Sequence, residues 1–460
     1  MPQAVDWDRA YNIERSVADI IARQAISGWM FDTLGAHRHV KYLEDLQEEL
    51  YKRVRPSLRL VLTIPYKDPV ARPFKKNGEV NANVLKWYEN GNEVVGGPFT
   101  RISWEEPNLG SDKQLKELLF WLGWVPTQWN YKKDKRGRKM YDKVTKEPIT
   151  SSAKLTEDSY DSLTSPVGKD IAKYLKAKHR ASQIRGFIKN VDCNDLIHAA
   201  AFPLGTPTGR MRHNIVVNVP KASEKVFFGT QMRGLFLHRP GRKLVGHDAS
   251  GLEARLFGHF LNDEELIHEL IHGDFHTKIW TPLIDFIDSR DNAKNFTYAI
   301  IYGAQDKKLG TMSQTRPNGW SDERTGAAMR AIMEKKIPAM GELMEKVRRA
   351  SKRGYLVGLD GRKLFLRSAH SALNLAIQGA GAIVMKESIV LLDVWVNRYK
   401  LDVIKVGDFH DEAQADVLPA HVHAYGNLAV RSIIRAGQNL DLNCPLDADY
   451  KVGDSWAETH

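Results

Sequence analysis

The chain has 460 residues, with 67 Lys and Arg against 56 Asp and Glu, which gives a formal net charge of +11 when histidine is neutral. Its composition, 42% hydrophobic and 27% charged, indicates a globular protein of roughly two to four domains or one protein with subdomains. It excludes disordered, collagen-like and disulfide-scaffold classes.

The two cysteines, Cys193 and Cys444, are too few for a disulfide framework or a four-cysteine zinc site, so we expect a reducing, cytoplasmic setting. The N-terminus lacks the apolar core of a signal peptide. Lys386 and Glu387 interrupt the most apolar run, residues 376–396, so we expect no membrane span.

The net positive charge is concentrated in two segments. Residues 55–76 carry a net charge of +5 and residues 131–146 carry +6, so the rest of the chain is balanced. Such a local excess of Lys and Arg favours a polyanionic partner.

Helical periodicity dominates the first part of the chain. Apolar residues at three- to four-residue spacing predict helices over 13–53 with an interruption at Gly28. Residues 54–100 lose this spacing, and four prolines followed by Gly96-Gly97-Pro98 indicate an irregular insertion. We further expect a helix over 112–122 capped by Ser111, an exposed hairpin or loop over 131–146, and a helix over 169–189 with its cationic face outward.

Beyond residue 190 the pattern changes to short strands and turns between helices. We predict a strand over 242–247 ending at Asp248, a helix over 288–301, one or two helices over 322–353, a buried helix over 379–396, and strands over 403–406 and 413–417 around the turn 407–412.

The first chemical motif follows the strand at 242–247. The predicted strand ends at Asp248, and small residues follow it. A second carboxylate, Glu253, lies five residues after Asp248. A strand end with an ordinary Asx turn would give the same pattern.

The second motif is the helix at 288–301. Arg290, Lys294 and Tyr298 lie at positions i, i+4 and i+8, hence on one helix face. Two cations in line with an aromatic ring suit a triphosphate with a base stacked beside it. A solvated cationic face is the alternative, although Tyr298, Ile301 and Tyr302 are poor choices for solvent.

The third motif is the turn 407–412, which holds Asp411 and Glu412. Turn formation alone could account for Gly and Asp here. The functional interpretation is that Asp411 and Asp248 meet in space and hold two Mg²⁺ ions, since small hard cations prefer carboxylate oxygens.

In this order the three motifs resemble those of the family A DNA polymerases, the DNA polymerase I family. DASGLEAR (248–255) is similar to the first palm motif, RDNAKNFTYAIIYG (290–303) to the fingers-helix motif, and HDE (410–412) to the second palm motif. Residues 208–210, 273–278 and 359–382 match as well, and these phrases are most similar to the replicative polymerases of short-tailed bacteriophages. The resemblance covers roughly residues 12–460 and is weak across the two basic segments.

The resemblance implies an α+β right-hand polymerase fold, in which an antiparallel palm sheet carries a helical thumb and fingers. It implies a thumb region over 1–192 with basic insertions at 55–97 and 131–146, a palm over 193–258 and 372–460, and fingers over 259–371. Thumb helices that lie along the phosphate backbone would explain their cationic faces.

The resemblance also implies template-directed extension of a primer 3′-hydroxyl with dNTPs. Asp248 and Asp411, with the Ala249 carbonyl, would hold two Mg²⁺ ions, and Glu412 completes the catalytic triplet. Arg290, Lys294 and His276 would grip the triphosphate, with Lys294 as proton donor to the leaving group. Arg210, Tyr302, Asn374, Gln378 and His410 match positions that contact template base, minor groove or primer end, although each could make a structural hydrogen bond instead.

Two further residues are implied to set nucleotide selectivity. Glu253 resembles the residue that closes the pocket against a ribose 2′-hydroxyl. Tyr298 stands where other members carry Phe, and the Tyr version resembles polymerases that accept dideoxynucleotides readily.

The chain departs from the family in two places. The match begins near residue 12, where most members have an exonuclease domain, so we expect no intrinsic 3′–5′ proofreading and either a separate exonuclease or a gap-filling role. The insertion at 55–97 lies where phage relatives bind thioredoxin. A thioredoxin-like processivity factor is therefore one hypothesis, beside duplex contact or another partner. We assign 131–146 to DNA backbone contact on charge alone. A replicative helicase is a further expected companion if the enzyme serves phage DNA replication in the host cytoplasm.

Two other classes of protein compete with this interpretation. A single-subunit RNA polymerase shares the palm and fingers, but its members lack an acidic gate such as Glu253 and the HDE triplet. A DNA-binding relative without catalysis would have lost Asp248, Asp411 or Lys294, and all three are present.

Overall fold

The computed structural model describes residues 5–63, 72–89, 93–95, 100–143, 145, 147–368 and 371–459, apart from the side chains of 61–63, 87–89, 93–95, 100–104, 275, 276 and 279. The chain divides into two compact units, one formed by residues 1–36 and 186–460 and the other by residues 37–185. Parts of the two basic insertions, 55–97 and 131–146, lie outside the described residues, namely 64–71, 90–92, 96–97, 144 and 146.

The larger unit contains a four-stranded antiparallel sheet of order β14-β15-β11-β16. Its apolar face packs Val245, Ala415 and Val417 against Tyr425 and Ala429 of a covering helix, because side chains alternate between the two faces of a strand. The strands are β11 (Lys243–Ala249), β14 (Val403–Phe409), β15 (Glu412–Val417) and β16 (Ala448–Gly453), and the helix is α15 (Val422–Asn439).

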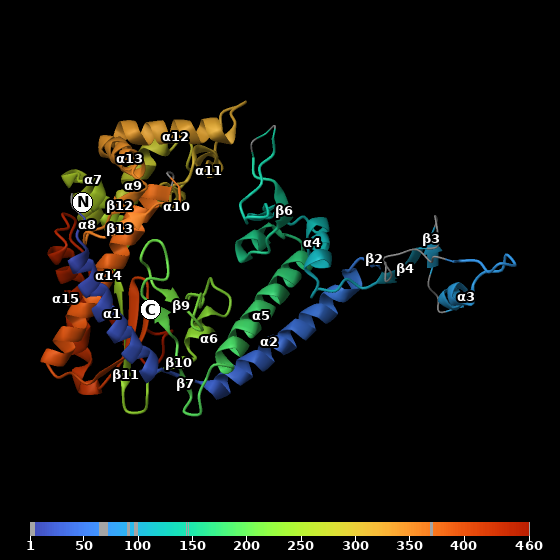
Figure 1. Ribbon diagram of the computed structural model, residues 1–460, viewed down its shortest axis with the longest axis horizontal. Coiled ribbons are helices and arrows are strands. Elements are labelled where there is room, and N and C mark those ends of the chain that lie inside the picture. Colours follow the sequence, from blue (N-terminus) through green and yellow to red (C-terminus); the bar gives the residue numbers. More distant parts are fainter. Residues whose placement is uncertain are drawn as a thin grey trace. The chain divides into compact units, whose positions relative to one another are not determined.

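Helix α14 (Ala372–Arg398) forms the core of this unit. It packs against α15 and against α1 (Trp7–Ser27), which runs alongside it (Figure 1). By its length, and by a mean hydropathy of 1.6 over an 18-residue stretch, α14 would suit a membrane span. However, 78% of that stretch is buried inside the protein. Its hydropathy therefore reflects its place in the core, and Lys386 is buried there among ion partners.

Helices dominate residues 252–351, which follow β11 in the sequence. Their apolar faces join α14 in one continuous core that includes Leu256, Phe296, Met329 and Ile377. The helices are α7 (Leu252–Leu261), α8 (Glu264–His272), α9 (Phe275–Trp280), α10 (Arg290–Ile301), α11 (Asp306–Gly310), α12 (Asp322–Lys336) and α13 (Pro338–Ser351), with the hairpin of β12 (Tyr355–Val357) and β13 (Lys363–Phe365) between α13 and α14.

Short elements complete the larger unit. Trp29 on β1 packs its ring 4.9 Å from Phe236 and 5.1 Å from Trp456, which joins the N-terminal segment to the end of the chain. These elements are β1 (Trp29–Phe31), β7 (Leu196–Ile197), β8 (Ala201–Phe202), β9 (Arg212–His213), α6 (Gly229–Arg233) and β10 (Phe236–Leu237), with β1 between β10 and β7 in a three-stranded sheet.

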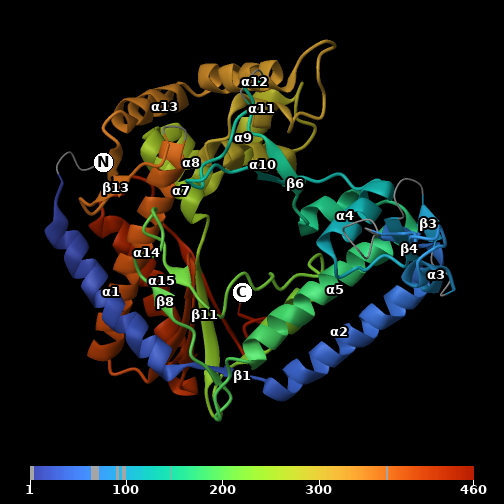
Figure 2. The same cartoon turned by 45° about the vertical axis from the view of Figure 1, so that its right-hand side comes forward.

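In the smaller unit, α2 and α5 lie side by side and antiparallel (Figure 2), and ion pairs join Arg53 to Asp170 and Arg185 to Glu44. The lysines of α5 are mostly exposed, as predicted, whereas Arg180 is buried and pairs with Glu157. The elements are α2 (Thr33–Val54), β2 (Val61–Thr63), α3 (Ala82–Glu89), β3 (Glu93–Val95), β4 (Thr100–Glu105), α4 (Asp112–Trp121), β5 (Trp129–Tyr131), β6 (Thr150–Ala153) and α5 (Pro166–Ile188).

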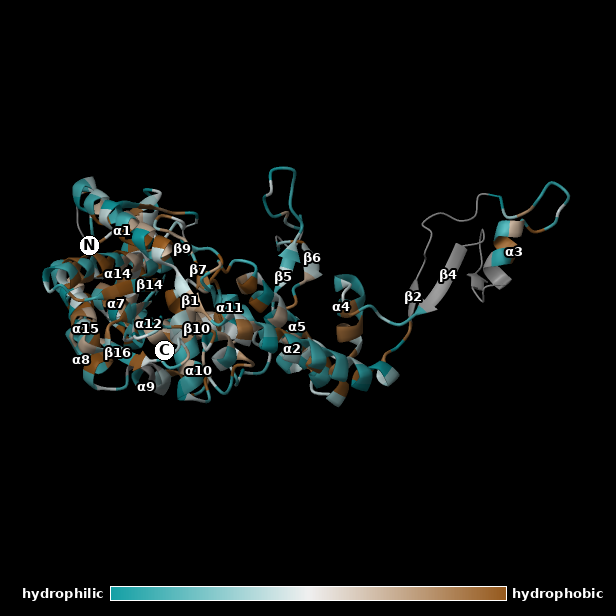
Figure 3. Cartoon of the chain, turned by 90° about the horizontal axis from the view of Figure 1, so that it is seen from below, coloured by the Kyte–Doolittle hydropathy of each residue, from teal (hydrophilic) through white to brown (hydrophobic). Residues whose placement is uncertain are grey.

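The second basic segment is an exposed hairpin, as predicted. β5 pairs with β6, bridges join Lys133 to Lys139 and Tyr141 to Pro148, and Gly137 takes the left-handed conformation that its turn requires. The loop beyond the two strands is coloured hydrophilic along most of its length (Figure 3).

The structure differs from the sequence predictions in three details. The insertion is not irregular, because β2, β4 and β3 form a sheet beside α3. Two of these strands, β2 and β3, have only three residues, too few for alternation to be recognised in the sequence. Gly28 is followed by strand β1, which the helical spacing of the surrounding residues did not indicate. Ser111 stands at the N-cap of α4, but its side chain makes no capping hydrogen bond.

Candidate active site

The carboxylates of Asp248 and Asp411 lie at the ends of neighbouring strands. Asp248 on β11 pairs in register with Glu412 on β15, and the backbone N–H of Ala249 donates to the Asp411 carbonyl over 3.0 Å. Asp411 is exposed in the two-residue turn after β14, where His410 adopts a left-handed φ of 61°. The structure thus brings together the two residues that the sequence placed about 160 positions apart.

No cluster of three or more His, Cys, Asp or Glu side chains able to hold a metal ion occurs in the described part of the chain. The acidic side chains at these strand ends are those of Asp248 and Asp411. Ala249 is the last residue of β11, and Gly251, with a φ of 60°, turns the chain directly into α7.

Glu412 is buried beneath this strand end, and its carboxylate is held by neighbouring donors. Gln414 donates from Nε2 over 2.9 Å, Trp456 donates from Nε1, and Arg233 lies 3.6 Å away. The Arg233 guanidinium also stacks 4.2 Å from the Trp456 ring centre. These contacts fit a residue that fixes the end of β15, and no sequence motif pointed to Arg233.

The cations of α10 face one pocket with Tyr298. The side chain of Ser289 caps the helix by accepting from the Asn292 N–H. An open pocket of about 320 Å³ is lined by α10, the start of α7, the end of α8 and the segment between α8 and α9. Its lining residues are Ser250, Gly251, Ala254, Arg255, Glu269, Leu270, Gly273, Asp274, Arg290, Lys294 and Tyr298. The predicted common face of Arg290, Lys294 and Tyr298 is confirmed.

Asp274 is a pocket residue that sequence reasoning missed. Its carboxylate accepts a hydrogen bond from Arg290 and caps α9 by accepting from Thr277 N over 3.2 Å. The hydrogen bond from Arg290 holds the pKa of Asp274 well below its usual range. His276 follows on α9, and its side chain lies outside the described residues.

Glu253, in the first turn of α7, joins two other predicted site residues. Its carboxylate accepts from Arg210 Nη2 over 2.5 Å and from the Tyr302 hydroxyl over 2.6 Å. Burial, and then the nearby carboxylates of Glu253 and Asp411, raise the pKa of Tyr298. Glu253, Tyr298 and Asp411 therefore lie in one region of the larger unit.

The remaining predicted contacts lie on α14 and in the β14–β15 turn. Asn374 and Gln378 are half-buried on the first turns of α14, and no described donor reaches the buried Asn374 Oδ1. His410 lies with its ring 5.6 Å from His213, a residue without a sequence signal. Burial, then His410, lowers the pKa of His213 to about 4.

Comparisons with known proteins show the family to which the chain belongs. The sequence model of the family described as DNA polymerase family A matches residues 92–458. The DNA-directed DNA polymerase of Escherichia phage Phieco32 is 25% identical over 97% of this chain and 98% of its own, and that of Escherichia phage T7 is 27% identical over 98% and 70%. DNA polymerase I of Pseudomonas aeruginosa is 26% identical over 90% of this chain and 46% of its own.

The fold has a solved counterpart in the polymerase domain of Pol1 from M. smegmatis, determined in complex with DNA primer-template and dNTP. The two superpose with a TM-score of 0.72 at 18% identity, covering 97% of this chain and 70% of that one. The expected α+β polymerase fold is thereby confirmed. The chain belongs to DNA polymerase family A and is a template-directed DNA polymerase.

Proposed function

We propose that Asp248 and Asp411 are the metal-binding carboxylates of the polymerase reaction, and that the pocket beside them receives the dNTP. The observation that carries this proposal is the junction of β11 and β15, which sets the two carboxylates at adjacent strand ends. Carboxylate and carbonyl oxygens are the donors that Mg²⁺ prefers, so the residues fit this metal. Two Mg²⁺ ions held by Asp248, Asp411 and the Ala249 carbonyl would stabilise the charge on the attacking and leaving oxygens.

The protein's own cations would bind the triphosphate of the dNTP. Arg290 and Lys294 face the pocket from successive turns of α10, and we include His276 on α9 in the same role. Arg290 would exchange its bond with Asp274 for a bidentate contact with phosphate. As the primer 3′-hydroxyl attacks the α-phosphate, Lys294 would donate a proton to the departing pyrophosphate.

Glu253 would act as the wall against a ribose 2′-hydroxyl. The bonds from Arg210 and Tyr302 hold its carboxylate in one orientation, which a steric and polar gate requires. Tyr298 would lie against the base and sugar of the nucleotide and admit dideoxynucleotides. Glu412 would contribute by fixing the strand that carries Asp411.

The DNA partner would be a primer-template. Arg210, Tyr302, Asn374, Gln378 and His410 would contact the template base, minor groove or primer end, where purine N3 and pyrimidine O2 acceptors recur in every pair. We assign the thumb to 1–192, the palm to 193–258 and 372–460, and the fingers to 259–371. Within the proposed thumb, the exposed lysines of α5 and the hairpin 131–146 would contact phosphates.

Primer extension tests the proposal. Purified protein should extend a primer on a template with dNTPs and Mg²⁺ and should prefer dNTPs to rNTPs. Glu253→Ala should lose most of that preference while retaining dNTP addition. An enzyme that uses rNTPs as readily as dNTPs would overturn the assignment of the sugar wall. The same assay with added thioredoxin tests the processivity-factor hypothesis for 55–97.

A further inference from the structure

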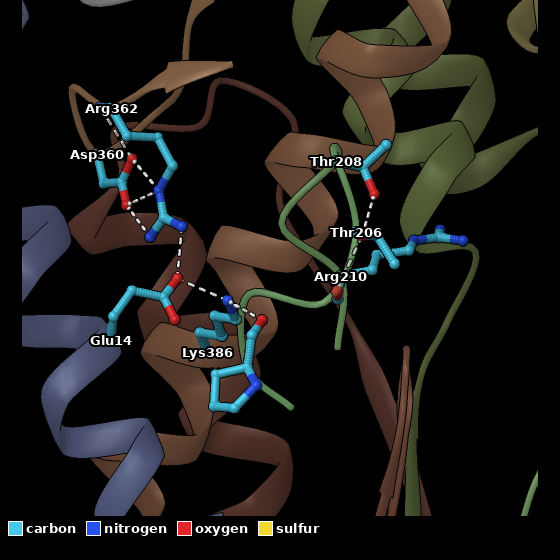
Figure 4. A network of polar contacts seen from close by, with 8 residues as sticks. Glu14, Thr206, Thr208, Arg210, Asp360, Arg362 and Lys386 are labelled. Carbon is cyan, nitrogen blue, oxygen red and sulfur yellow. Dashed lines mark hydrogen bonds and ion pairs between the residues drawn. The ribbon is translucent and has the colours of Figure 1, made fainter. Parts of the chain in front are cut away.

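A buried network of four charged side chains joins α1, α14 and the β12–β13 hairpin, among residues to which the proposed reaction assigns no role. Lys386, Asp360 and Arg362 are 1%, 2% and 5% exposed. Lys386 Nζ donates to Glu14 over 2.6 Å, Arg362 donates to the same carboxylate, and Arg362 Nη2 donates to Asp360 over 2.6 Å (Figure 4). Two cations thus balance two anions, as buried charges require.

This network touches the loop 203–210. Lys386 Nζ donates to the carbonyl of Pro203 over 2.9 Å. Gly209, at a φ of +76°, lies against Arg362, since a Cβ there would be 3.6 Å from Nη1. The other side of the loop rests on α14, where a Cβ on Gly379 would meet the Thr208 carbonyl at 3.5 Å. The loop is therefore seated on Lys386 of α14 and Arg362 of the β12–β13 hairpin, and Glu14 of α1 pairs with both of these cations.

The loop ends at Arg210 and fixes the backbone of that residue. Thr206 Oγ1 donates to the Arg210 carbonyl over 2.9 Å and lies 3.0 Å from Thr208 Oγ1 (Figure 4). Beyond the loop, the Arg210 guanidinium reaches Glu253, which also accepts from Tyr302. A continuous set of contacts therefore runs from Lys386 to the proposed sugar wall.

We propose that Lys386, Glu14, Arg362 and Asp360 are positioning residues that seat the loop 203–210 and thereby aim Arg210 at Glu253. The inference rests on the proposed function of Glu253 and extends it to four residues that are not among those lining the pocket of α10. Small displacements of supporting groups carry large kinetic effects, because a shift of about 1 Å can cost roughly a hundredfold in rate.

Two substitutions each remove a different contact in the set that runs from Lys386 to Glu253. Lys386→Met removes the donor to Pro203 at similar length, and Thr206→Val removes the donor to the Arg210 carbonyl without altering the charge balance. Each should lower the ratio of dNTP to rNTP kcat/KM by about tenfold or more. Arg180→Met, which breaks the ion pair between buried Arg180 and partly exposed Glu157 in the smaller unit, is the control. It should lower the unfolding midpoint and leave the ratio unchanged.

A double-mutant cycle with Arg210→Met decides whether Lys386 acts through Arg210. We expect Lys386→Met to have little further effect on dNTP kcat/KM or on the ratio in the Arg210→Met background. Additive effects, or an unchanged ratio in both Lys386→Met and Thr206→Val, would overturn the proposal. Equal use of dNTPs and rNTPs by the wild type would instead overturn the role of Glu253. In that case the cycle on dNTP kcat/KM still tests the positioning role.

Discussion

Arg290 on α10 donates a hydrogen bond to the carboxylate of Asp274, the residue that caps α9. The guanidinium that faces the pocket is therefore already paired with an anion. The hydrogen bond to Asp274 comes from Arg290 Nε. If Arg290 binds the triphosphate as proposed, the phosphate would compete with the Asp274 carboxylate for that side of the guanidinium, so the pair would set a cost on dNTP binding.

Asp274→Asn tests that competition. Asn keeps the helix cap but removes the negative charge, so the KM for dNTP should fall by about two- to fivefold with kcat little changed. Asp288→Asn is the matched control, since Asp288 bonds to Asn292 and not to Arg290. Steady-state kinetics at low salt measures the difference, and an increase in KM would show that Asp274 assists binding.

Tyr298→Phe should make the enzyme reject dideoxynucleotides. The hydroxyl of Tyr298 lies in the region of Glu253 and Asp411, which contribute to its raised pKa, and Phe cannot substitute for its polar contacts. Tyr302→Phe is the control, because it loses the bond to Glu253 instead. Competition between ddNTP and dNTP in primer extension gives the ratio. If the wild type rejects dideoxynucleotides as strongly as ribonucleotides, and Tyr298→Phe changes nothing, the prediction is contradicted.

Neutralising the exposed hairpin should flatten the salt dependence of DNA binding. Replacing its eight cations by Gln should reduce the slope of log K against log salt by about one for each phosphate that the hairpin no longer neutralises. The replaced residues are Lys132, Lys133, Lys135, Arg136, Arg138, Lys139, Lys143 and Lys146. A matched set on α13, Lys346, Arg348 and Arg349, pairs with glutamates of its own helix and should change the slope less. An unchanged slope in the hairpin variant would remove DNA binding from its role.

His247 should make the larger unit sensitive to acid. Its ring is 3% exposed, and burial, then Lys405, lowers its pKa to about 3 against the opposing effect of Glu412. Above pH 6.5 the ring is neutral in both states. Between pH 6.5 and 3 the unfolded chain binds a proton that the folded protein does not, so stability falls as pH falls. From pH 7 to pH 4 this group should cost roughly 3 kcal/mol.

Urea unfolding of wild type and His247→Leu from pH 7 to pH 4 checks this effect. The variant should lose less stability across this range than the wild type. His423→Leu, which changes an exposed histidine, is the control and should follow the wild type. Parallel curves for wild type and His247→Leu would contradict the pKa assigned to His247.

The sequence predicted the parts of the site that follow from periodicity and motif. Spacing placed Arg290, Lys294 and Tyr298 on one face of α10, and the strand-turn pattern placed Asp411 between β14 and β15. Contacts between distant segments carry no such local signal. The pairing of Arg290 with Asp274 and the burial of Glu412 depend on how helices and strands pack.

The same reason explains the missed structural elements. Strands of three residues, such as β1 and β3, show no alternation to recognise. Lys386 interrupts an apolar run and suggested only that the run does not span a membrane, whereas its partners Glu14 and Pro203 lie far away in sequence. Such a residue is understood only once the fold brings its partners together.

The central claim is that Asp248 and Asp411 act together at the ends of β11 and β15. Its most direct test is the kcat/KM of dNTP addition in Mg²⁺ for Asp248→Asn and Asp411→Asn, beside Asp454→Asn at the opposite end of the sheet. The first two variants should each lose about a thousandfold or more with unchanged unfolding midpoints, and Asp454→Asn should stay within about twofold of wild type. Rates near wild type in either Asp248→Asn or Asp411→Asn would contradict the account.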